Sequence, residues 1–264
     1  MTPNTKLPEV RFHPLSLASY VVPVALVAFW QLAVTVGWWP STLIAPPLAV
    51  VADLYRLSLN GTLMVHVEAS IWRLVLGFGI GAAIGISVGS WIGLSRIAQR
   101  FLEPTISILA PIPPPAWIPL LVITLGIEEA SKIWLIAIGV FFVLVTNTVS
   151  GIRGVDSRLV EVALVFDKSA WETLTGILLP GALPTILTGL RVALGLSWIL
   201  LIAAELIAAQ KGLGWFIWDS RNFSRPDDMI AGMLTIGFLG MMSDKIVLYI
   251  RNQCLVWQTS FEGQ

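Results

Sequence analysis

The residue types that most often carry catalysis are few in this chain and stand far apart. The two histidines, His13 and His66, lack the spacing of metal ligands. The single cysteine, Cys254, cannot form a disulfide within the chain and does not by itself make a metal site. No segment matches the phosphate-binding loop G-x-x-x-x-G-K-[ST], and no serine, histidine and aspartate set indicates a hydrolase. We therefore expect no catalytic residue, no metal site and no cofactor bound by this chain.

One carboxylate lies within an apolar segment and is the strongest candidate for a specific role. Glu205 stands in the sequence LLIAAELIAAQ, and a carboxylate at membrane depth is costly, so it marks a functional position by default. We expect Glu205 near the outer end of its helix, as a gate or as a partner in an interhelical hydrogen bond. An ordinary position at the membrane interface is the alternative. Arg73 could pair with Glu205, although the sequence alone does not bring them together.

A run of prolines between residues 111 and 119 predicts an irregular stretch of backbone. Prolines remove backbone donors and break a helix, and non-helical backbone at membrane depth is tolerated where it is buried in protein or lines a water-filled cavity. We expect this stretch near a solute pathway; an irregular cytoplasmic start of the helix is the alternative. The residues expected along the pathway are Pro113, Pro114, Trp117, Asn147, Trp198 and Glu205. Asn147 could instead serve helix packing.

Five glycines recur at every fourth position of one apolar stretch: Gly77, Gly81, Gly85, Gly89 and Gly93. Small residues at this spacing let two helix backbones approach closely, because lipid supplies no hydrophobic drive for association. We expect this face to meet protein, either as a tight static contact or as a contact that slides during function. Gly85, in the middle, is expected to be the least tolerant of a larger side chain.

The composition indicates an integral membrane protein. Hydrophobic residues make up 56% of the 264 positions and charged residues only 12%, whereas about 25% is usual for a soluble domain. The 16 basic and 16 acidic residues balance, so nothing favours nucleic acid as a partner. A helix needs about 20 apolar residues to cross a bilayer. The sequence predicts an all-α protein with six transmembrane helices, at about 17–36, 70–94, 105–125, 132–150, 184–209 and 229–250.

The distribution of Lys and Arg predicts the orientation. With the N-terminus in the cytoplasm, ten of these residues lie inside and six outside, as the positive-inside rule favours. We expect one transmembrane domain over residues 1–264, with a cytoplasmic tail at 1–16, a cytoplasmic loop at 151–183 and both termini inside. The first apolar run is expected to stay as an anchor rather than be cleaved as a signal peptide.

The polar loop predicts two short amphipathic helices outside the membrane. The first is expected to begin at Asp156 or Ser157, and a turn follows at Asp167. The second opens with the capping box Ser169–Ala–Trp–Glu172, in which the hydroxyl and the carboxylate each accept a backbone N–H. We expect it to end at Pro180, because proline cannot continue the helical hydrogen bonds.

This loop resembles the EAA loop of bacterial ABC importer permeases, whose pattern is E-A-A, three residues, G, about nine residues, an apolar pair and Pro. Glu161, Ala163 and Pro180 match, while Val162 replaces the first Ala and Asp167 replaces the Gly. Aspartate tolerates the left-handed turn that the Gly would serve. The similarity extends to WRLVLGFGIG (72–81), PIPPPAWIPLLVITLGIEEASKI (111–133), LPGALPTILTGLRVALGLSW (179–198) and AELIAAQKGLG. Together these segments resemble the nitrate, sulfonate and taurine permeases, in particular the aliphatic sulfonate and taurine members.

The resemblance implies a type I ABC importer permease fold in the bacterial inner membrane. It implies a homodimer with the pathway at its interface, two cytoplasmic ATPase subunits that bind ATP and Mg, and a periplasmic or lipoprotein substrate-binding protein. The residues expected to contact the ATPase are Arg158, Glu161, Ala163, Leu164, Phe166, Asp167, Lys168 and Pro180.

The resemblance also implies inward transport of a small anion by alternating access, either an aliphatic sulfonate such as taurine or a nitrate-like oxyanion. Because Glu205 would repel an anion, direct binding to Glu205 is not expected. The alternative functions are an ATP-independent secondary transporter, which usually shows inverted repeats with paired broken helices, and a channel, which would not need the loop.

Overall fold

The computed structural model describes residues 20–255, apart from the side chains of Val160, Val162, Leu164, Ala170 and Ala208. These residues form helices and no strand, which confirms the all-α prediction. The helices are α1 (Val21–Thr35), α2 (Pro47–Leu59), α3 (Thr62–Leu94), α4 (Arg96–Leu109), η2 (Pro114–Trp117), α5 (Ile118–Leu125), α6 (Glu129–Arg153), α7 (Ser157–Val165), α8 (Ala170–Thr173), η3 (Leu174–Leu178), α9 (Leu179–Ala208), α10 (Leu213–Asn222) and α11 (Pro226–Cys254).

Four helices in the described part are long and apolar enough to cross a membrane: α3, α6, α11 and the continuous helix Trp171–Ile207. One of the six expected spans differs in shape from the prediction. The first, expected at 17–36, lies partly outside the described residues, and its described helix α1 has 15 residues. The third is not straight, because α4 and the η2–α5 unit meet at 92°. The prolines between them remove the donors that a continuous helix would need.

The expected helix end at Pro180 is wrong. Helices α8, η3 and α9 form one helix of 37 residues that passes through Pro180 and Pro184. The segment before Pro180 is a wider π-helical turn, in which the N–H of Leu179 donates to the carbonyl of Leu174. Because regular bonding is already interrupted there, the missing donor of Pro180 falls at an existing irregularity and the chain continues as a helix.

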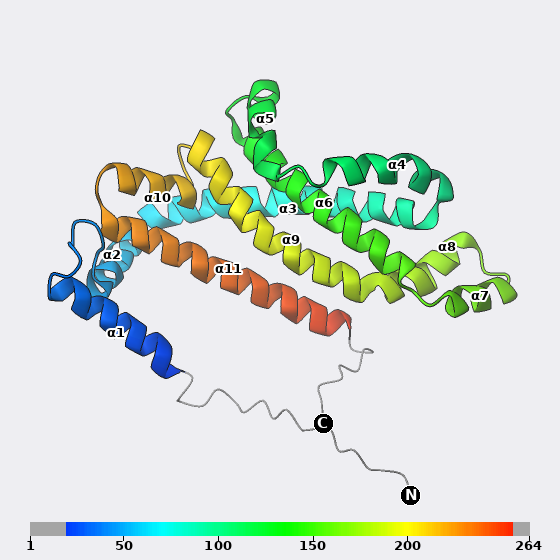
Figure 1. The fold of residues 1–264 in the computed structure, drawn as a ribbon, viewed down its shortest axis with the longest axis horizontal. Coiled ribbons are helices and arrows are strands. Elements are labelled where there is room, and N and C mark those ends of the chain that lie inside the picture. Colours follow the sequence, from blue (N-terminus) through cyan, green and yellow to red (C-terminus); the bar gives the residue numbers. More distant parts are fainter. Residues whose placement is uncertain (1–19, 256–264) are drawn as a thin grey trace, which may run out of the picture.

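The core of the bundle lies where α3, α6 and α9 cross, and α11 runs beside α9 (Figure 1). Buried side chains from these helices form one apolar cluster, which includes Leu74, Ile136, Leu144 and Leu201. The short helices α7 and α8 lie at one end of the bundle, and α2 and α10 lie at the other (Figure 1). A second apolar cluster, with Val50 and Leu57 of α2, packs this far end together.

The five glycines of α3 lie against α6. A β-carbon added at Gly77 would lie 2.7 Å from the Cβ of Ile136, and one added at Gly81 would lie 2.5 Å from the carbonyl oxygen of Ala137. At Gly85 the nearest atom, Leu144 Cβ, would be 3.0 Å away. The glycines thus permit a close contact between two helices of the same chain. Gly81 has less room than Gly85, so the structure favours Gly81 rather than Gly85 as the position least tolerant of a larger side chain.

Candidate functional site

The α7–α8 segment (residues 157–173) has the local structure that the sequence predicts. Helix α7 begins after Asp156, whose Oδ1 accepts the N–H of Arg158 at 2.9 Å. Before α8, the N–H of Ser169 donates to Glu172 Oε2 at 2.8 Å, and the N–H of Glu172 donates to Ser169 Oγ at 3.2 Å. Both bonds of the expected capping box are therefore present.

The turn between α7 and α8 is left-handed at Asp167, with φ 50°. The N–H of Lys168 donates to the carbonyl of Ala163 at 3.0 Å, which closes the end of α7 as in a Schellman motif. Ala163 is buried beneath the turn, with 2% of its surface exposed. The turn fixes the angle between the two helices, although the family pattern has a glycine where this chain has Asp167.

Large apolar side chains on this segment are exposed. Phe166 and Trp171 are 73% and 71% exposed, and Val165 is 80% exposed. Among the residues expected to contact the ATPase, Arg158, Glu161, Asp167 and Lys168 are also exposed, whereas Pro180 is half-buried within the long helix. The side chain of Leu164 lies outside the described part. Val165 and Trp171 were not among the residues expected to contact the ATPase, although their exposed apolar side chains lie beside residues that were.

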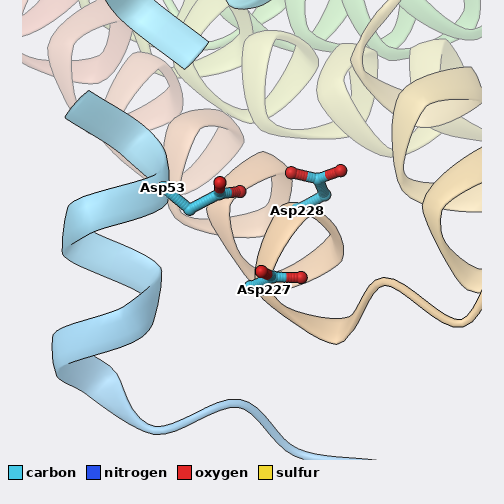
Figure 2. Close-up of side chains that lie close together, drawn as sticks. All are labelled: Asp53, Asp227 and Asp228. Carbon is cyan, nitrogen blue, oxygen red and sulfur yellow. The ribbon is translucent and has the colours of Figure 1, made fainter. Parts of the chain in front are cut away.

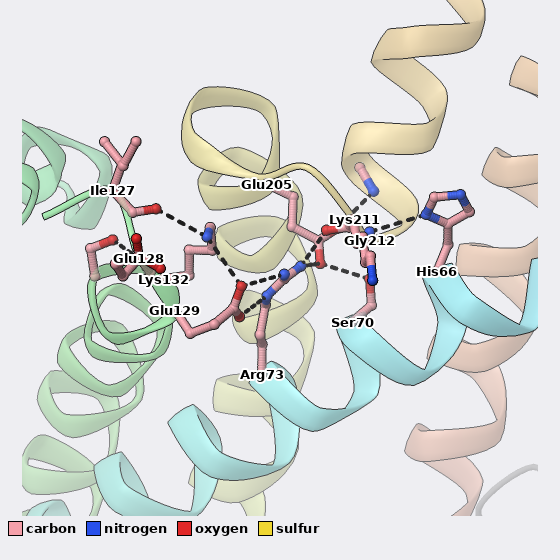
Figure 3. A network of polar contacts seen from close by, with 12 residues as sticks. His66, Ser70, Arg73, Ile127, Glu128, Glu129, Lys132, Glu205, Lys211 and Gly212 are labelled. Atoms are coloured by element: carbon pink, nitrogen blue, oxygen red, sulfur yellow. Dashed lines mark hydrogen bonds and ion pairs between the residues drawn. The ribbon is translucent and has the colours of Figure 1, made fainter.

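At the opposite end of the bundle, Glu205 is fully buried within a polar network (Figure 3). Its Oε1 accepts from Arg73 Nη1 and from Ser70 Oγ, both at 2.7 Å. Its Oε2 accepts the N–H of Gly214 at 2.7 Å, and the N–H of Leu213 donates to Ser70 Oγ at 2.8 Å. Glu205 therefore joins α3, α9 and the loop before α10, as an interhelical hydrogen-bonding residue would.

Arg73 connects this group to a third helix. Its Nε and Nη2 donate to the two carboxylate oxygens of Glu129, at 2.5 and 2.7 Å, and its Nη1 donates to the carbonyl of Lys211 at 2.6 Å. Lys132 Nζ lies 3.3 Å from Glu129 Oε1. Paired and hydrogen-bonded charges are the form in which such groups are tolerated inside a membrane protein. We call Ser70, Arg73, Glu129, Glu205 and residues 211–214 the Arg73 network.

Two glycines let the loop close on Glu205. Gly212 has φ 127°, which favours glycine, and its N–H donates to His66 Nδ1 at 3.2 Å. A β-carbon at Gly214 would lie 3.1 Å from the Cβ of Glu205. Ser70 and Glu129 were not predicted from the sequence. The possible pairing of Arg73 with Glu205 is confirmed.

The residues expected along a pathway come from residues 113–117, α6 and α9, and η2 contacts both of these helices. Trp198 is buried and its Nε1 donates to Ser243 Oγ of α11 at 3.0 Å. Asn147 Nδ2 donates to the carbonyl of Val143 at 2.8 Å, and its Cβ would be 2.6 Å from a β-carbon added at Gly189. These contacts, like those of Glu205, are helix packing.

The proline stretch borders an apolar groove. Trp117 lines this groove of about 270 Å³ together with Trp134, Phe141 and Phe142 of α6. Pro113 is exposed and Pro114 is half-buried. A separate cavity of about 380 Å³ beside the Arg73 network has a charged lining, which includes Arg73, Glu129, Lys132 and Lys211.

Known proteins resemble this chain in both sequence and fold. Residues 81–251 match the family described as the inner membrane component of binding-protein-dependent transport systems. SsuC of Bacillus subtilis (strain 168), named as an aliphatic sulfonates transport permease protein, is 37% identical over 99% of this chain and 96% of its own length. TauC of Escherichia coli (strain K12), named as a taurine transport system permease protein, is 33% identical over 92% of this chain and 90% of its own.

A solved structure has the same fold. A chain of the MetNI methionine ABC transporter, solved in inward-facing conformations, matches with a TM-score of 0.65 at 17% identity and covers 73% of this chain and 95% of that chain. This likeness confirms the type I importer permease fold.

Proposed function

The chain belongs to the family of binding-protein-dependent transport system inner membrane components, and on that premise we propose that it moves a small anion into the cell by alternating access driven by ATP. Its family is that of the membrane permeases of ABC transporters, in which ATP hydrolysis belongs to a separate subunit, so the chain is not an enzyme. We propose an aliphatic sulfonate such as taurine as the solute, or a nitrate-like oxyanion. The names of SsuC and TauC support the first, and the name of a further relative, a nitrate import permease protein, supports the second.

The observation that carries the proposal is the exposed apolar surface of the α7–α8 segment. Val165 lies on α7, Trp171 lies on α8, and Phe166 lies in the turn between them, which is closed by a backbone hydrogen bond and followed by a capping box. A rigid apolar surface of this kind fits a groove on another protein. We propose that the segment faces the cytoplasm and docks on the ATPase subunit, which holds ATP and Mg. The complete importer would contain two permease subunits, two ATPases and an external binding protein.

The long helix Trp171–Ile207 gives a path for motion. It begins in the α7–α8 segment and reaches Glu205 about 50 Å away, at 1.5 Å per residue. When ATP closes the ATPase pair, movement of α8 would pass along this helix to the Arg73 network. ATP hydrolysis would let the ATPase pair reopen and α8 return. The pathway between the two permease subunits would then open alternately to the two sides of the membrane.

The test uses the full importer, purified with its ATPase and binding protein and placed in vesicles. We expect Phe166→Ala and Trp171→Ala each to reduce co-purification of the ATPase and ATP-dependent taurine uptake, because buried interface anchors often contribute about 2 kcal/mol or more. Phe223→Ala is the matched control, since Phe223 is 70% exposed at the opposite end of the bundle. Normal assembly and uptake in both variants would contradict the docking. Uptake without the ATPase would support a secondary transporter or a channel instead.

A further inference from the structure

Three carboxylates meet where α2 contacts the start of α11. Asp53 comes from α2, and Asp227 and Asp228 come from the first turn of α11. One oxygen of each carboxylate lies within 4.8 Å of the others. Figure 2 shows the carboxylate of Asp53 pointing from α2 toward the two aspartates of α11. Asp53 and Asp228 are buried, with 6% and 2% of their surfaces exposed.

Two arginines neutralise only part of this charge. Arg56 Nε donates to Asp53 Oδ1 at 2.7 Å, and its Nη2 lies 3.1 Å from Asp228 Oδ1. Arg225 Nη1 lies 3.0 Å from Asp228 Oδ2, while its Nη2 donates to Asp219 Oδ2 at 2.8 Å. The two guanidinium groups thus form ion pairs with three carboxylates, those of Asp53, Asp228 and Asp219. Asp227 adds a further negative charge beside them.

The second oxygen of Asp53 is the observation that points to a ligand. Asp53 Oδ2 is buried and accepts no hydrogen bond from any residue in the described part of the chain. A buried carboxylate oxygen without a donor is costly, and more so beside two other carboxylates. Arg56 does not relieve this cost, because it is directed at Oδ1. No guanidinium group of the described residues donates to Oδ2 of Asp53.

We propose that Asp53, Asp227 and Asp228 bind a hard divalent cation, Ca²⁺ or Mg²⁺. The donor set is oxygen only, which these cations prefer. One oxygen of each carboxylate lies close enough to the other two for a single cation to bind all three. The cation would tie α2 to α11 at the end of the bundle that lies away from α7 and α8 (Figure 1).

The site is independent of the transported solute, and its test does not require transport. The full-length protein is purified in detergent, stripped with EDTA and unfolded thermally in CaCl₂ or MgCl₂, with NaCl at equal ionic strength as the reference. We expect millimolar Ca²⁺ to raise the Tm by a few degrees, because a cation that binds only the folded state stabilises it by mass action. Calorimetric titration with CaCl₂ gives the affinity directly, expected at about 10⁻⁴ to 10⁻³ M as in extracellular calcium modules.

The variant Asp227→Asn removes one ligand at a half-buried position and should fold. We expect it to lose at least tenfold in Ca²⁺ affinity. Glu68→Gln removes one charge from an exposed position of α3 and should respond to Ca²⁺ as the wild type does. The proposal is overturned if neither cation stabilises the wild type, or if Asp227→Asn responds equally. The proposal is also overturned if the Tm rises when the pH is lowered and does not respond to either cation. In that case a proton shared between Asp53 and Asp228, rather than a metal ion, would offset the negative charge.

Discussion

Arg73 holds two carboxylates that stand far from it in the sequence. Glu129 is 56 positions away and Glu205 is 132 positions away. The pair with Glu205 is fully buried, whereas the side chain of Glu129 is 52% exposed. Loss of one partner from such a buried group typically costs about 3–5 kcal/mol, because the other charge remains in a low-dielectric site. The three residues therefore act as one unit rather than as separate pairs.

The left-handed turn at Asp167 leads to a prediction about a single residue. With φ at 50°, glycine at this position would fit without strain, and a β-branched side chain would not. We expect Asp167→Gly to retain ATPase binding and uptake. Asp167→Val should reduce both, because it would lose about 1–3 kcal/mol of turn stability. Co-purification of the ATPase measures the effect. If Val functions as well as Asp, the charge of Asp167 rather than its backbone conformation is what matters.

Local features were predictable from the sequence and distant ones were not. The Asp167 turn and the Ser169 capping box depend on residues within a few positions of one another, so their side-chain chemistry was enough. The partners of Arg73 and the meeting of Asp53 with Asp228 depend on which helices pack together. Nearly continuous apolar helices have no periodicity that reveals which face is buried.

At the level of helices, prolines acted in two ways. The cluster between α4 and α5 broke the expected third span, as their missing donors predict. Pro180 did not end its helix, because a π-helical turn precedes it. A π turn depends on the packing around a helix as well as on its residues, so it could not be predicted from the residues alone.

The contact between α3 and α6 leads to a prediction at this scale. Gly81 and Gly85 face α6, whereas Ala83 is exposed on the other side of α3. We expect Gly81→Leu to lower folded yield and thermal stability more than Gly85→Leu, because a β-carbon at Gly81 has less room. Overpacking of this kind typically costs about 1–3 kcal/mol.

Ala83→Leu is the control for these variants and should be tolerated. Equal tolerance at Gly81 and Ala83 would show that the close contact is unnecessary for folding. Normal assembly of Gly81→Leu with loss of uptake would instead indicate a contact that moves during transport.

At the level of the whole molecule, α3, α6 and α9 form one block. The glycines of α3 let this helix pack closely against α6, and the Arg73 network joins both helices to the end of α9. Because α9 is continuous with α8, the exposed apolar segment is attached directly to this block. The block as a whole, rather than a single helix, is therefore the unit that we expect an ATPase to move.

This arrangement predicts that the network and the docking segment fail in different ways. Glu205→Gln keeps the size of the side chain but removes the charge that Arg73 binds, which should cost about 3–5 kcal/mol as estimated above for this buried pair. We expect normal co-purification of the ATPase, lower thermal stability and less taurine taken up per ATP hydrolysed, since motion of α8 would no longer be passed firmly to α3. Phe166→Ala should instead lose the ATPase itself. Glu68→Gln, at an exposed position of α3, is the control and should preserve the ratio of uptake to hydrolysis. A normal ratio in Glu205→Gln would mean that the motion reaches the rest of the permease by another route, such as the contact between α9 and α11.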